Sequence, residues 1–312
     1  MENNTQLKEM IRSMVIDVLQ GQNQESASSQ PIKQAPRDQV EPGVFDTVDD
    51  AIQAAKAAQA RFEDCTLATR EKVIADIRAA MRPRVQELAQ KTVEETGMGR
   101  VADKVLKLNL TLDKTPGVED LVTECETGDN GMTLYELSAY GVIGAITPST
   151  NPAETLICNT IGMLAAGNAV FFSVHPGAKH LSRLLVSELN QIIAKSIGIE
   201  NLIVTLREPS IESAQEMMLH PDVSLLVVTG GPGVVKQALQ SGKKVIGAGA
   251  GNPPAFVDET ADIKKAAQDI VLGASLDNNI LCIAEKSVVA MRQIEPQLVQ
   301  EMVKAGCVLI EN

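Results

Sequence analysis

The chain has 312 residues, which is enough for about two domains, and 44% of them are hydrophobic, so a sizeable core can form. Only 2% are aromatic and tryptophan is absent, so that core must be aliphatic, as is usual for the buried strands of parallel α/β sheets. The net charge of −12 excludes a general nucleic-acid binder, because no surplus of bases is available to neutralise phosphates.

Residues 5–19 predict a short amphipathic helix at the start of the chain. Its apolar side chains recur at the spacing of one helical face: Leu7, Met10, Ile11, Met14, Val15, Val18 and Leu19. Residues 20–43 are rich in Gln, Ser and Pro and predict a flexible linker. A helix on such a linker either folds back onto its own domain or docks in a groove of a partner, and we favour the docking peptide.

Residues 44–119 carry a mainly helical pattern. Thr47 is a suitable N-cap for the first of these helices, and Gly97 is the expected stop of a later one. From Met132 to Pro148 the pattern changes to that of an extended chain.

The next part of the chain alternates between strands and helices. Apolar, β-branched runs at 142–147, 169–174, 201–205 and 222–229 are separated by helical stretches at 153–166, 178–197 and 211–220. This order predicts a parallel sheet with crossover helices, in which ligands bind beyond the carboxyl ends of the strands. The most apolar stretch, residues 156–174, contains Asn and Gly and is interpreted as helix, turn and strand, not as a membrane span.

Three motifs follow predicted strands: "TPSTNP", "HPGAK" and "TGGPG". In the last, the backbone amides of Gly230, Gly231 and Gly233 could approach a pyrophosphate, aided by the positive end of the next helix. The turn is not a GxGxxG fingerprint, because Lys236 occupies the final position, and "GAGAGN" at 247–252 fails that template as well. A tight packing turn is therefore the alternative.

The segment "DNNILCIAEK" contains the candidate nucleophile, Cys282. A nucleophilic thiolate needs donors that stabilise the developing oxyanion, and the amides of the preceding asparagine pair, Asn278 and Asn279, could supply them. Cys65, Cys125 and Cys307 lack such neighbours, and Cys158 is expected on the apolar face of a helix. An inert core thiol is the alternative for Cys282.

The cysteines and histidines give no sign of a structural metal or a disulfide framework. The five cysteines are odd in number, widely spaced and without a CxxC pair, and none of the three histidines lies in a ligand pattern. This usage fits a reducing cytosol.

Taken in order, the motifs resemble those of the aldehyde dehydrogenase superfamily. "AITPSTNP", "AAGNAVFFSVHPGAK", "VVTGGPGVV", "GAGAGNPPAFV" and "NNILCIAEKS" are similar to five successive family motifs, and the likeness runs from about residue 44 to the end of the chain. It implies an α/β fold with a Rossmann-type parallel sheet. The implied domains are an NAD-binding domain at 44–257, with an oligomerisation strand near 132–141, and the start of a second, α/β catalytic domain at 258–312.

The resemblance also implies site residues. Cys282 would be the catalytic thiol, and the oxyanion asparagine of the family falls on Thr150, with Asn151 beside it. Which of the two takes that role stays open, so the backbone N–H of Cys282 is the safer donor. The implied cofactor contacts are Thr147, Pro148, Ser149, His175, Thr229, Gly230, Gly231, Gly233 and Gly249, with His175 replacing the lysine that usually contacts the ribose. No metal is implied.

One departure from the family pattern carries a prediction about the reaction. Where hydrolytic members have their general-base glutamate, this chain has Gly247, so that position cannot activate water to attack a thioester. The chain therefore resembles the CoA-acylating branch, in which coenzyme A accepts the acyl group from Cys282. The implied reaction interconverts a short-chain aldehyde and its acyl-CoA, with NAD as the cofactor and coenzyme A as a co-substrate.

Within that branch, "EETGMGR", "TPSTNPAETLICN" and "DNNILCIAEK" most resemble the enzymes of ethanolamine- and propanediol-type bacterial microcompartments. The resemblance implies that residues 5–19 dock to shell proteins, and that the enzyme is cytoplasmic, encapsulated and, at full length, a homo-oligomer, with neither nucleic acid nor membrane as a partner. Family members continue well past Asn312, so we expect the 312-residue polypeptide alone to bind NAD weakly and to turn over poorly.

Two rival functions remain. A hydrolytic, NAD(P)-dependent aldehyde dehydrogenase would release the free acid, and Gly247 speaks against it. An inactive, truncated protein that only docks to the shell is the second rival, and the retained Cys282 speaks against that one.

Overall fold

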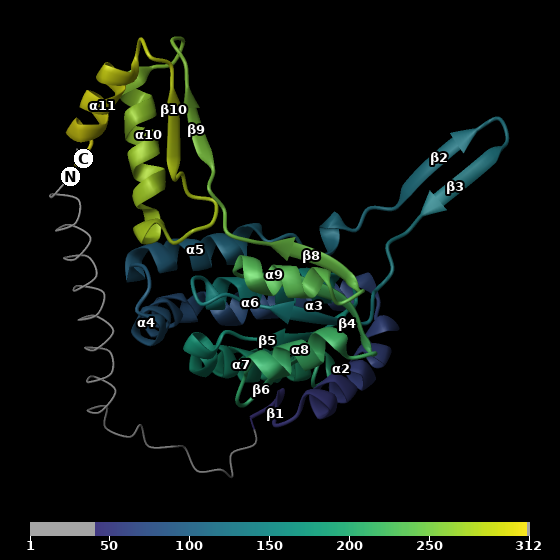
Figure 1. Ribbon diagram of the computed structural model, residues 1–312. Coiled ribbons are helices and arrows are strands. Elements are labelled where there is room, and N and C mark those ends of the chain that lie inside the picture. Colours follow the sequence, from purple (N-terminus) through teal and green to yellow (C-terminus); the bar gives the residue numbers. More distant parts are fainter. Residues whose placement is uncertain (1–40, 311–312) are drawn as a thin grey trace, which may run out of the picture. The chain divides into compact units, whose positions relative to one another are not determined.

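The computed structural model describes residues 41–310 (Figure 1). The predicted helix at 5–19 and the predicted linker up to residue 40 lie outside these residues. The strands are β1 (Val44–Phe45), β2 (Glu124–Gly128), β3 (Gly131–Tyr135), β4 (Val142–Ile146), β5 (Ala169–Ser173), β6 (Ile203–Leu206), β7 (Val223–Thr229), β8 (Lys244–Ala248), β9 (Pro254–Val257) and β10 (Ser287–Ala290).

Helices precede and separate these strands. The α-helices are α2 (Val48–Glu63), α3 (Leu67–Met81), α4 (Val85–Thr96), α5 (Val101–Lys114), α6 (Pro152–Ala165), α7 (Lys179–Ile197), α8 (Ile211–Leu219), α9 (Pro232–Leu239), α10 (Ile263–Ser275) and α11 (Glu295–Lys304). Four short 3₁₀ turns are η1 (Arg82–Arg84), η2 (Val118–Asp120), η3 (Pro176–Ala178) and η4 (Leu276–Asn279). None of the helices in the described residues has the length and apolar character needed to cross a membrane.

Six strands form one parallel sheet in the order β1-β6-β5-β4-β7-β8. The four predicted strands are β4, β5, β6 and β7, each within two residues of its expected bounds. From β4 the chain first moves through β5 to β6, and then returns to lay β7 on the other side of β4. The carboxyl ends of β4 and β7 therefore form the switch point at which open parallel sheets bind ligands.

Helices cover both faces of this sheet. Helices α6 and α7 connect strands that advance toward β6, whereas α8 and α9 connect strands that advance the other way. Because such crossovers are right-handed, the two pairs lie on opposite faces. Every residue of β4 and β5 is buried between them, and the core is aliphatic apart from a few Phe side chains such as Phe171 and Phe172.

Local signals at the first helices are confirmed. Thr47 caps α2, with its hydroxyl oxygen accepting from the Asp50 N–H at 3.2 Å, and Gly97 ends α4 with a left-handed φ of 65°. The predicted helical pattern from residue 44 is wrong for its first two residues, because Val44–Phe45 pairs with β6. The end of the predicted linker also belongs to the sheet, since the buried Gly43 accepts a hydrogen bond from Thr205 N–H at 2.8 Å.

Strands β2 and β3 form an antiparallel hairpin whose residues are all exposed (Figure 1). The strand predicted near 132–141 corresponds to β3, but it ends at Tyr135, and the pairing strand β2 had no counterpart in the sequence prediction.

A second, smaller group of elements follows the large sheet. Strands β9 and β10 pair in parallel, and four residues are buried in the core that they share with α10 and α11: Val257, Ala267, Ile270 and Leu298. The predicted domain boundary at 257/258 stays a prediction. The pairing of β9 with β10 favours a boundary before β9.

Candidate active site

The predicted cofactor-binding residues lie at one edge of the large sheet. Thr147 directly follows β4, Thr229 ends β7, His175 follows β5 and Gly249 follows β8. Because these four strands are neighbours and parallel, their carboxyl ends share that edge. The strand order thus brings the three motifs together at the switch point.

The "TGGPG" turn leaves the start of α9 open. Gly231 is the N-cap of α9 with no side-chain cap, and a Cβ placed on Gly231 or Gly233 would meet no atom within 4 Å. Gly230 is more constrained, since its N–H donates to the Ala248 carbonyl at 3.1 Å and a Cβ there would lie 2.7 Å from Val234 Cγ1. The free amides of a helix start, approachable by a bulky anion, fit a pyrophosphate.

The other two cofactor motifs differ in burial. Thr147 is 2% exposed, and its hydroxyl has no hydrogen-bond partner among residues 41–310, whereas Pro148 and Ser149 are half-buried. His175 is exposed, and its Nδ1 accepts from the Gly177 N–H at 3.0 Å, so the imidazole caps the η3 turn. That bond fixes the ring and leaves Nε2 at the exposed side chain for a ligand.

Residues 277–286, here called the thiol loop, carry the predicted nucleophile. Asp277, Asn278 and Asn279 all have left-handed backbone, with φ of 49°, 55° and 60°, a conformation that Asp and Asn adopt more readily than other non-glycine residues. Cys282 follows them and is exposed, as a nucleophile must be. Lys286 stabilises the loop, because its ammonium donates to the Leu281 carbonyl at 2.8 Å and to Asn279 Oδ1 at 2.6 Å.

Two expectations about neighbouring side chains are wrong. Asn279 cannot stabilise an oxyanion with its amide, because Nδ2 already donates to the carbonyls of Ala274 at 2.6 Å and Glu285 at 3.0 Å. Cys158 does not lie on the buried face of its helix: it is exposed on α6. Exposure alone therefore does not distinguish Cys282 from Cys158.

The second Gly-rich turn, residues 249–253, lies against the thiol loop. A Cβ on Gly251 would collide with the carbonyl of Cys282, so only glycine lets the two segments approach this closely. The Lys286 N–H donates to the Pro253 carbonyl at 3.2 Å, and Ser287 Oγ donates to Asn252 Oδ1 at 3.2 Å. This explains the glycine-rich sequence, which here serves backbone contact with the cysteine segment.

A buried carboxylate anchors the start of the thiol loop. Asp277 is completely buried and accepts from the Arg100 N–H at 2.9 Å. Two ammonium groups of α5 also reach it: Lys104 Nζ lies 3.0 Å from Asp277 Oδ2, and Lys107 donates to the same oxygen. The Lys104 side chain is itself fully buried, so these charges interact out of water, where an unpaired ion is strongly disfavoured.

The same lysines also bind the turn after β4. Lys104 donates to the Thr150 carbonyl, Lys107 donates to Asn151 Oδ1, and Lys107 Nζ lies 3.3 Å from Glu154 Oε1. We call Lys104, Lys107, Glu154 and Asp277 the lysine–carboxylate cluster. Through it, the two segments predicted to carry catalysis, the Thr150–Asn151 turn and the thiol loop, are joined.

The two lysines of this cluster were not among the residues predicted from the sequence. Lys104 shares a buried stripe of α5 with Leu108 and Leu112, four and eight residues later, and a cation in an apolar stripe could have marked a buried ionic contact. Asp277 stood in the quoted cysteine segment, but nothing in its neighbours indicated that it is buried.

Two residues of the cluster, Asp277 and Lys104, have shifted pKa values. Burial alone would raise the pKa of Asp277, but hydrogen bonds from Lys107, from the Arg100 N–H and from Lys104 together hold that pKa below its usual range. Burial lowers the pKa of Lys104, and the nearby Glu154 carboxylate partly opposes the effect. The buried aspartate is therefore ionised at neutral pH.

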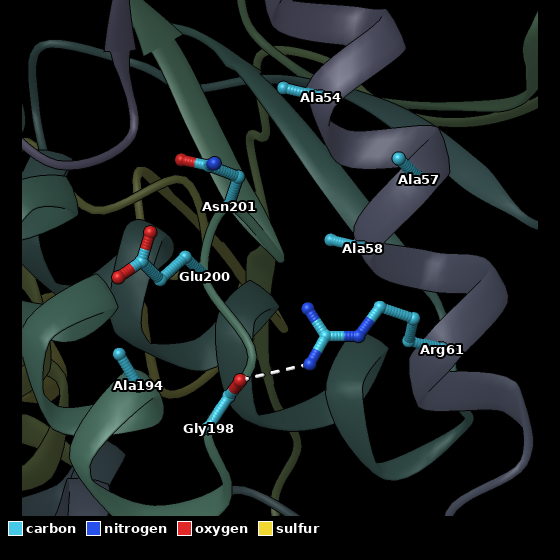
Figure 2. A pocket seen from close by; sticks show the side chains of 8 residues that line it. All are labelled: Ala54, Ala57, Ala58, Arg61, Ala194, Gly198, Glu200 and Asn201. Carbon is cyan, nitrogen blue, oxygen red and sulfur yellow. Dashed lines mark hydrogen bonds between the residues drawn. The ribbon is translucent and has the colours of Figure 1, made fainter.

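A separate hollow of about 330 Å³ lies between α2 and the end of α7 (Figure 2). Its lining includes three alanines of α2 and the end of α7, and Arg61 spans it by donating to the Gly198 carbonyl at 3.0 Å. Residues 198–201 precede β6, so the hollow lies at the amino ends of the strands, and it contains none of the predicted site residues.

Comparisons with known proteins agree with this architecture. The chain is 52% identical over 268 residues to a CoA-propanoylating propanal dehydrogenase of Salmonella typhimurium, which covers 86% of this chain and 58% of that protein. A propionaldehyde dehydrogenase from the Clostridium phytofermentans fucose-utilisation bacterial microcompartment superposes with a TM-score of 0.84 at 51% identity, covering 87% of this chain and 63% of the other.

A Rhodopseudomonas palustris propionaldehyde dehydrogenase, solved with bound CoA and an acylated cysteine, superposes with a TM-score of 0.83 at 51% identity, covering 88% and 63% of the two chains. The chain thus spans somewhat less than two thirds of the length of these relatives. The model of the aldehyde dehydrogenase family matches residues 18–307. With the parallel sheet, the glycine turns and the exposed thiol in place, the chain belongs to the aldehyde dehydrogenase family.

Proposed function

We propose that the protein is an NAD-dependent, CoA-acylating aldehyde dehydrogenase, which interconverts a short-chain aldehyde and its acyl-CoA through a thioester on Cys282. The observation that carries the proposal is the exposed Cys282, whose backbone lies against the turn at Gly251. The chain also has glycine at position 247, where hydrolytic members of the family have their general base. The CoA-propanoylating activity named for the Salmonella relative supports the same chemistry.

The covalent steps need little beyond the thiol and oxyanion donors. The Cys282 thiolate attacks the aldehyde carbon, and the carbonyl oxygen becomes an alkoxide that nearby N–H groups stabilise. Bound NAD would supply the hydride acceptor that turns this adduct into a thioester. The thiolate of coenzyme A then attacks the thioester carbon, the C–S bond to Cys282 breaks, and the acyl-CoA leaves.

The position of Gly247 favours coenzyme A over water as the acceptor. Gly247 lies in β8, and a Cβ there would be 3.2 Å from Val235 Cγ1, so a longer side chain would require its neighbours to move. Glu285, close to the thiol in sequence, packs its carboxylate against the backbone of Gly273 on α10. Position 247 therefore offers no carboxylate base for water, and the Glu285 carboxylate is directed at α10.

The residues that would hold NAD are those at the sheet edge. We propose that the amides of Gly231 and Gly233 at the open start of α9 bind the pyrophosphate. The remaining proposed contacts to the cofactor are Thr147, Pro148, Ser149, His175, Thr229, Gly230 and Gly249. The proposed oxyanion donors are the Asn151 side-chain amide and the Cys282 N–H. The adjacent Thr150 is fixed by the hydrogen bond from Lys104 to its carbonyl.

We also propose an assembly for the complete protein. The exposed hairpin residues Met132, Leu134 and Tyr135 support an oligomerisation role for β3. Residues 5–19 would dock to microcompartment shell proteins, and the enzyme would be cytoplasmic and encapsulated, as the microcompartment origin of one solved relative suggests.

The NAD-binding domain would run from residue 44 to the end of β8, and the catalytic domain would start at β9.

A CoA-dependence experiment tests the proposed reaction. The full-length protein is mixed with NAD and propanal, NADH is followed by absorbance, and Cys282 is analysed by peptide mass spectrometry. Without coenzyme A we expect at most one NADH per protein and a propionyl group on Cys282, and coenzyme A should restore continuous turnover. The Cys282→Ser variant should lose both signals, whereas the matched variant of an exposed thiol, Cys158→Ser, should keep them.

Two outcomes would support the rivals instead. Continuous NADH formation in the absence of coenzyme A, with free propionate as the product, would indicate the hydrolytic enzyme. Failure to acylate Cys282 under any condition would favour a protein that only docks.

A further inference from the structure

The Lys107 ammonium lies between three oxygen atoms from two segments, which are the start of α6 and the thiol loop. Its ammonium donates to Asn151 Oδ1 and to Asp277 Oδ2, and lies 3.3 Å from Glu154 Oε1. The side chain is only 11% exposed. Two of its three donor hydrogens bind Asn151 and Asp277, and the contact with Glu154 is an ion pair without a hydrogen bond.

The first consequence concerns the orientation of the Asn151 amide. A side-chain amide can be turned by half a rotation, which exchanges its oxygen and nitrogen. Because Lys107 can only donate, it selects the orientation in which Oδ1 faces the ammonium, and Nδ2 then points elsewhere. In the described part of the chain, Nδ2 has one acceptor, Thr150 Oγ1 at a long 3.4 Å, so its donor capacity is largely unused.

The second consequence concerns the thiol loop. Asp277, held by the same ammonium, is the first of the three left-handed residues that lead to Cys282. Without Lys107, Asp277 would still be held by Lys104 and the Arg100 N–H. Asn151 Oδ1 would lose the one donor that it has in the described part of the chain. Lys104, on the neighbouring turn of α5, cannot replace Lys107 at Asn151, because its ammonium is engaged by the Thr150 carbonyl and by Asp277.

We propose that Lys107 is a positioning residue, which holds the Asn151 amide with its N–H groups directed at the carbonyl oxygen of an acyl group on Cys282. This inference rests on the proposed function. Glu154 balances the second positive charge, so the cluster holds two ammonium groups and two carboxylates. Lys107 touches neither the substrate nor the thiol in this scheme.

A comparison of two reactions of the same thiol separates positioning from simple structural support. Acetylation by p-nitrophenyl acetate passes through a tetrahedral oxyanion: the C–S bond forms, and p-nitrophenolate leaves with the electron pair. Alkylation by iodoacetamide displaces iodide and forms no oxyanion. Both rates are measured at Cys282 by peptide mass spectrometry in the 312-residue protein, with the exposed Cys158 as internal standard. Neither reaction needs NAD or coenzyme A.

The expected results use a matched pair of lysines on α5. Lys107→Met should lower the acetylation rate of Cys282 at least about tenfold, within the 10²–10³ range for loss of one oxyanion donor, and change alkylation less than about twofold. The exposed Lys114→Met should change neither. Asn151→Ala should reproduce the selective loss, and the double variant should show no further loss, because both changes remove the same donor.

Several results would overturn the inference. Equal loss of acetylation and alkylation in Lys107→Met would mean that the lysine only supports the fold, and additive losses in the double variant would mean that it acts independently of Asn151. If Lys107→Met is too unstable to assay, Lys107→Arg is used instead, which keeps the charge but changes the position of the donor groups. An unchanged ratio of acetylation to alkylation at Cys282 in that variant would contradict the inference. A Cys282→Ser protein that still forms the acyl-enzyme would instead contradict the proposed function.

Discussion

The sheet edge and the thiol loop are positioned by different forces. The turns after β4 and β7 follow strands in a large aliphatic core, and every residue of β4 is buried. The thiol loop adjoins a much smaller core with four buried residues, and two of the four residues of β9 and three of the four of β10 are exposed. Its anchor is instead the completely buried Asp277.

The sheet edge and the thiol loop should therefore respond differently to the loss of a side chain. Burial of many apolar side chains is additive and tolerant, so loss of one weakens the sheet without redirecting its turns. A buried ion pair depends on a few atoms, and the loss of one partner leaves the other charge unpaired in a medium that solvates it poorly. We therefore expect sharp, local failure at the thiol loop.

The largest expected effect comes from the sheet core. Phe172→Ala, in β5 and completely buried, should lower the free energy of unfolding by about 3–5 kcal/mol. Phe256→Ala, in β9 and 77% exposed, should change it by less than about 0.5 kcal/mol. Urea unfolding followed by circular dichroism measures both. Equal losses would mean that Phe256 is covered in solution, and the contrast between the two regions would then be wrong.

The next effect tests the ionic anchor. Asp277→Asn keeps the shape of the side chain but leaves Lys104 and Lys107 without their shared carboxylate, and should cost about 3 kcal/mol. Asp269→Asn is the matched control, because its pair with Lys265 is exposed and screened by water, so the change should have little effect on stability.

The location of the damage distinguishes the anchor from a general core residue. Hydrogen exchange in Asp277→Asn should rise first in residues 277–286 and leave β4 and β5 protected. Uniform loss of protection across the sheet would contradict a local role for Asp277.

A smaller effect is expected at the glycine facing this anchor. Gly99 has φ of 79°, and a Cβ there would collide with the Asp277 carboxylate, so Gly99→Ala should cost about 2–3 kcal/mol. Gly97 also has positive φ, at 65°, but a Cβ would meet nothing within 4 Å, and Gly97→Ala should cost only about 1 kcal/mol. Thermal melting of the two variants gives the difference. If Gly97→Ala were as costly as Gly99→Ala, backbone strain alone would explain both.

Much of the fold could be predicted from the sequence because it depends on local and periodic signals. The strands β4 to β7 are continuous apolar runs, and Thr47 and Gly97 mark helix ends by their own chemistry. The exposed hairpin strand β2 carries no such signal, since its side chains pack on no core. Strand order then brought the cofactor motifs together at one edge, as parallel topology requires.

The internal structure of the candidate site was less predictable. The role given to Asn279 failed because its amide is consumed by two carbonyls of its own loop, a fact of tertiary geometry. Lys107 and Asp277 are 170 residues apart in sequence, so their contact leaves no local pattern. The cysteine itself was found through motif order, not through its immediate neighbours.

The smallest expected effect is a change of stability with pH, and it isolates Asp277 from the many exposed acids. The pKa of Asp277 is lower in the folded protein than in the unfolded chain, where an aspartate titrates near 3.9. The stability that the ionised Asp277 contributes is therefore present above about pH 4, the pKa of the unfolded state. It is lost as the pH falls toward the lower pKa of the folded protein. In that window the unfolded state binds the extra proton, so stability falls by at most about 1.4 kcal/mol per pH unit from this group.

Other carboxylates with lowered pKa values, such as the exposed Asp113 and the half-buried Asp222, act in the same direction, so the wild type alone cannot assign the effect to Asp277. The difference in unfolding free energy between the wild type and Asp277→Asn removes their share, because both proteins retain them. That difference should be constant from pH 5 to 7 and should narrow below about pH 4. A difference that stayed constant down to pH 3 would mean that the pKa of Asp277 is the same in the folded protein and the unfolded chain. Asp277 would then stabilise the loop through its shape and not through its charge.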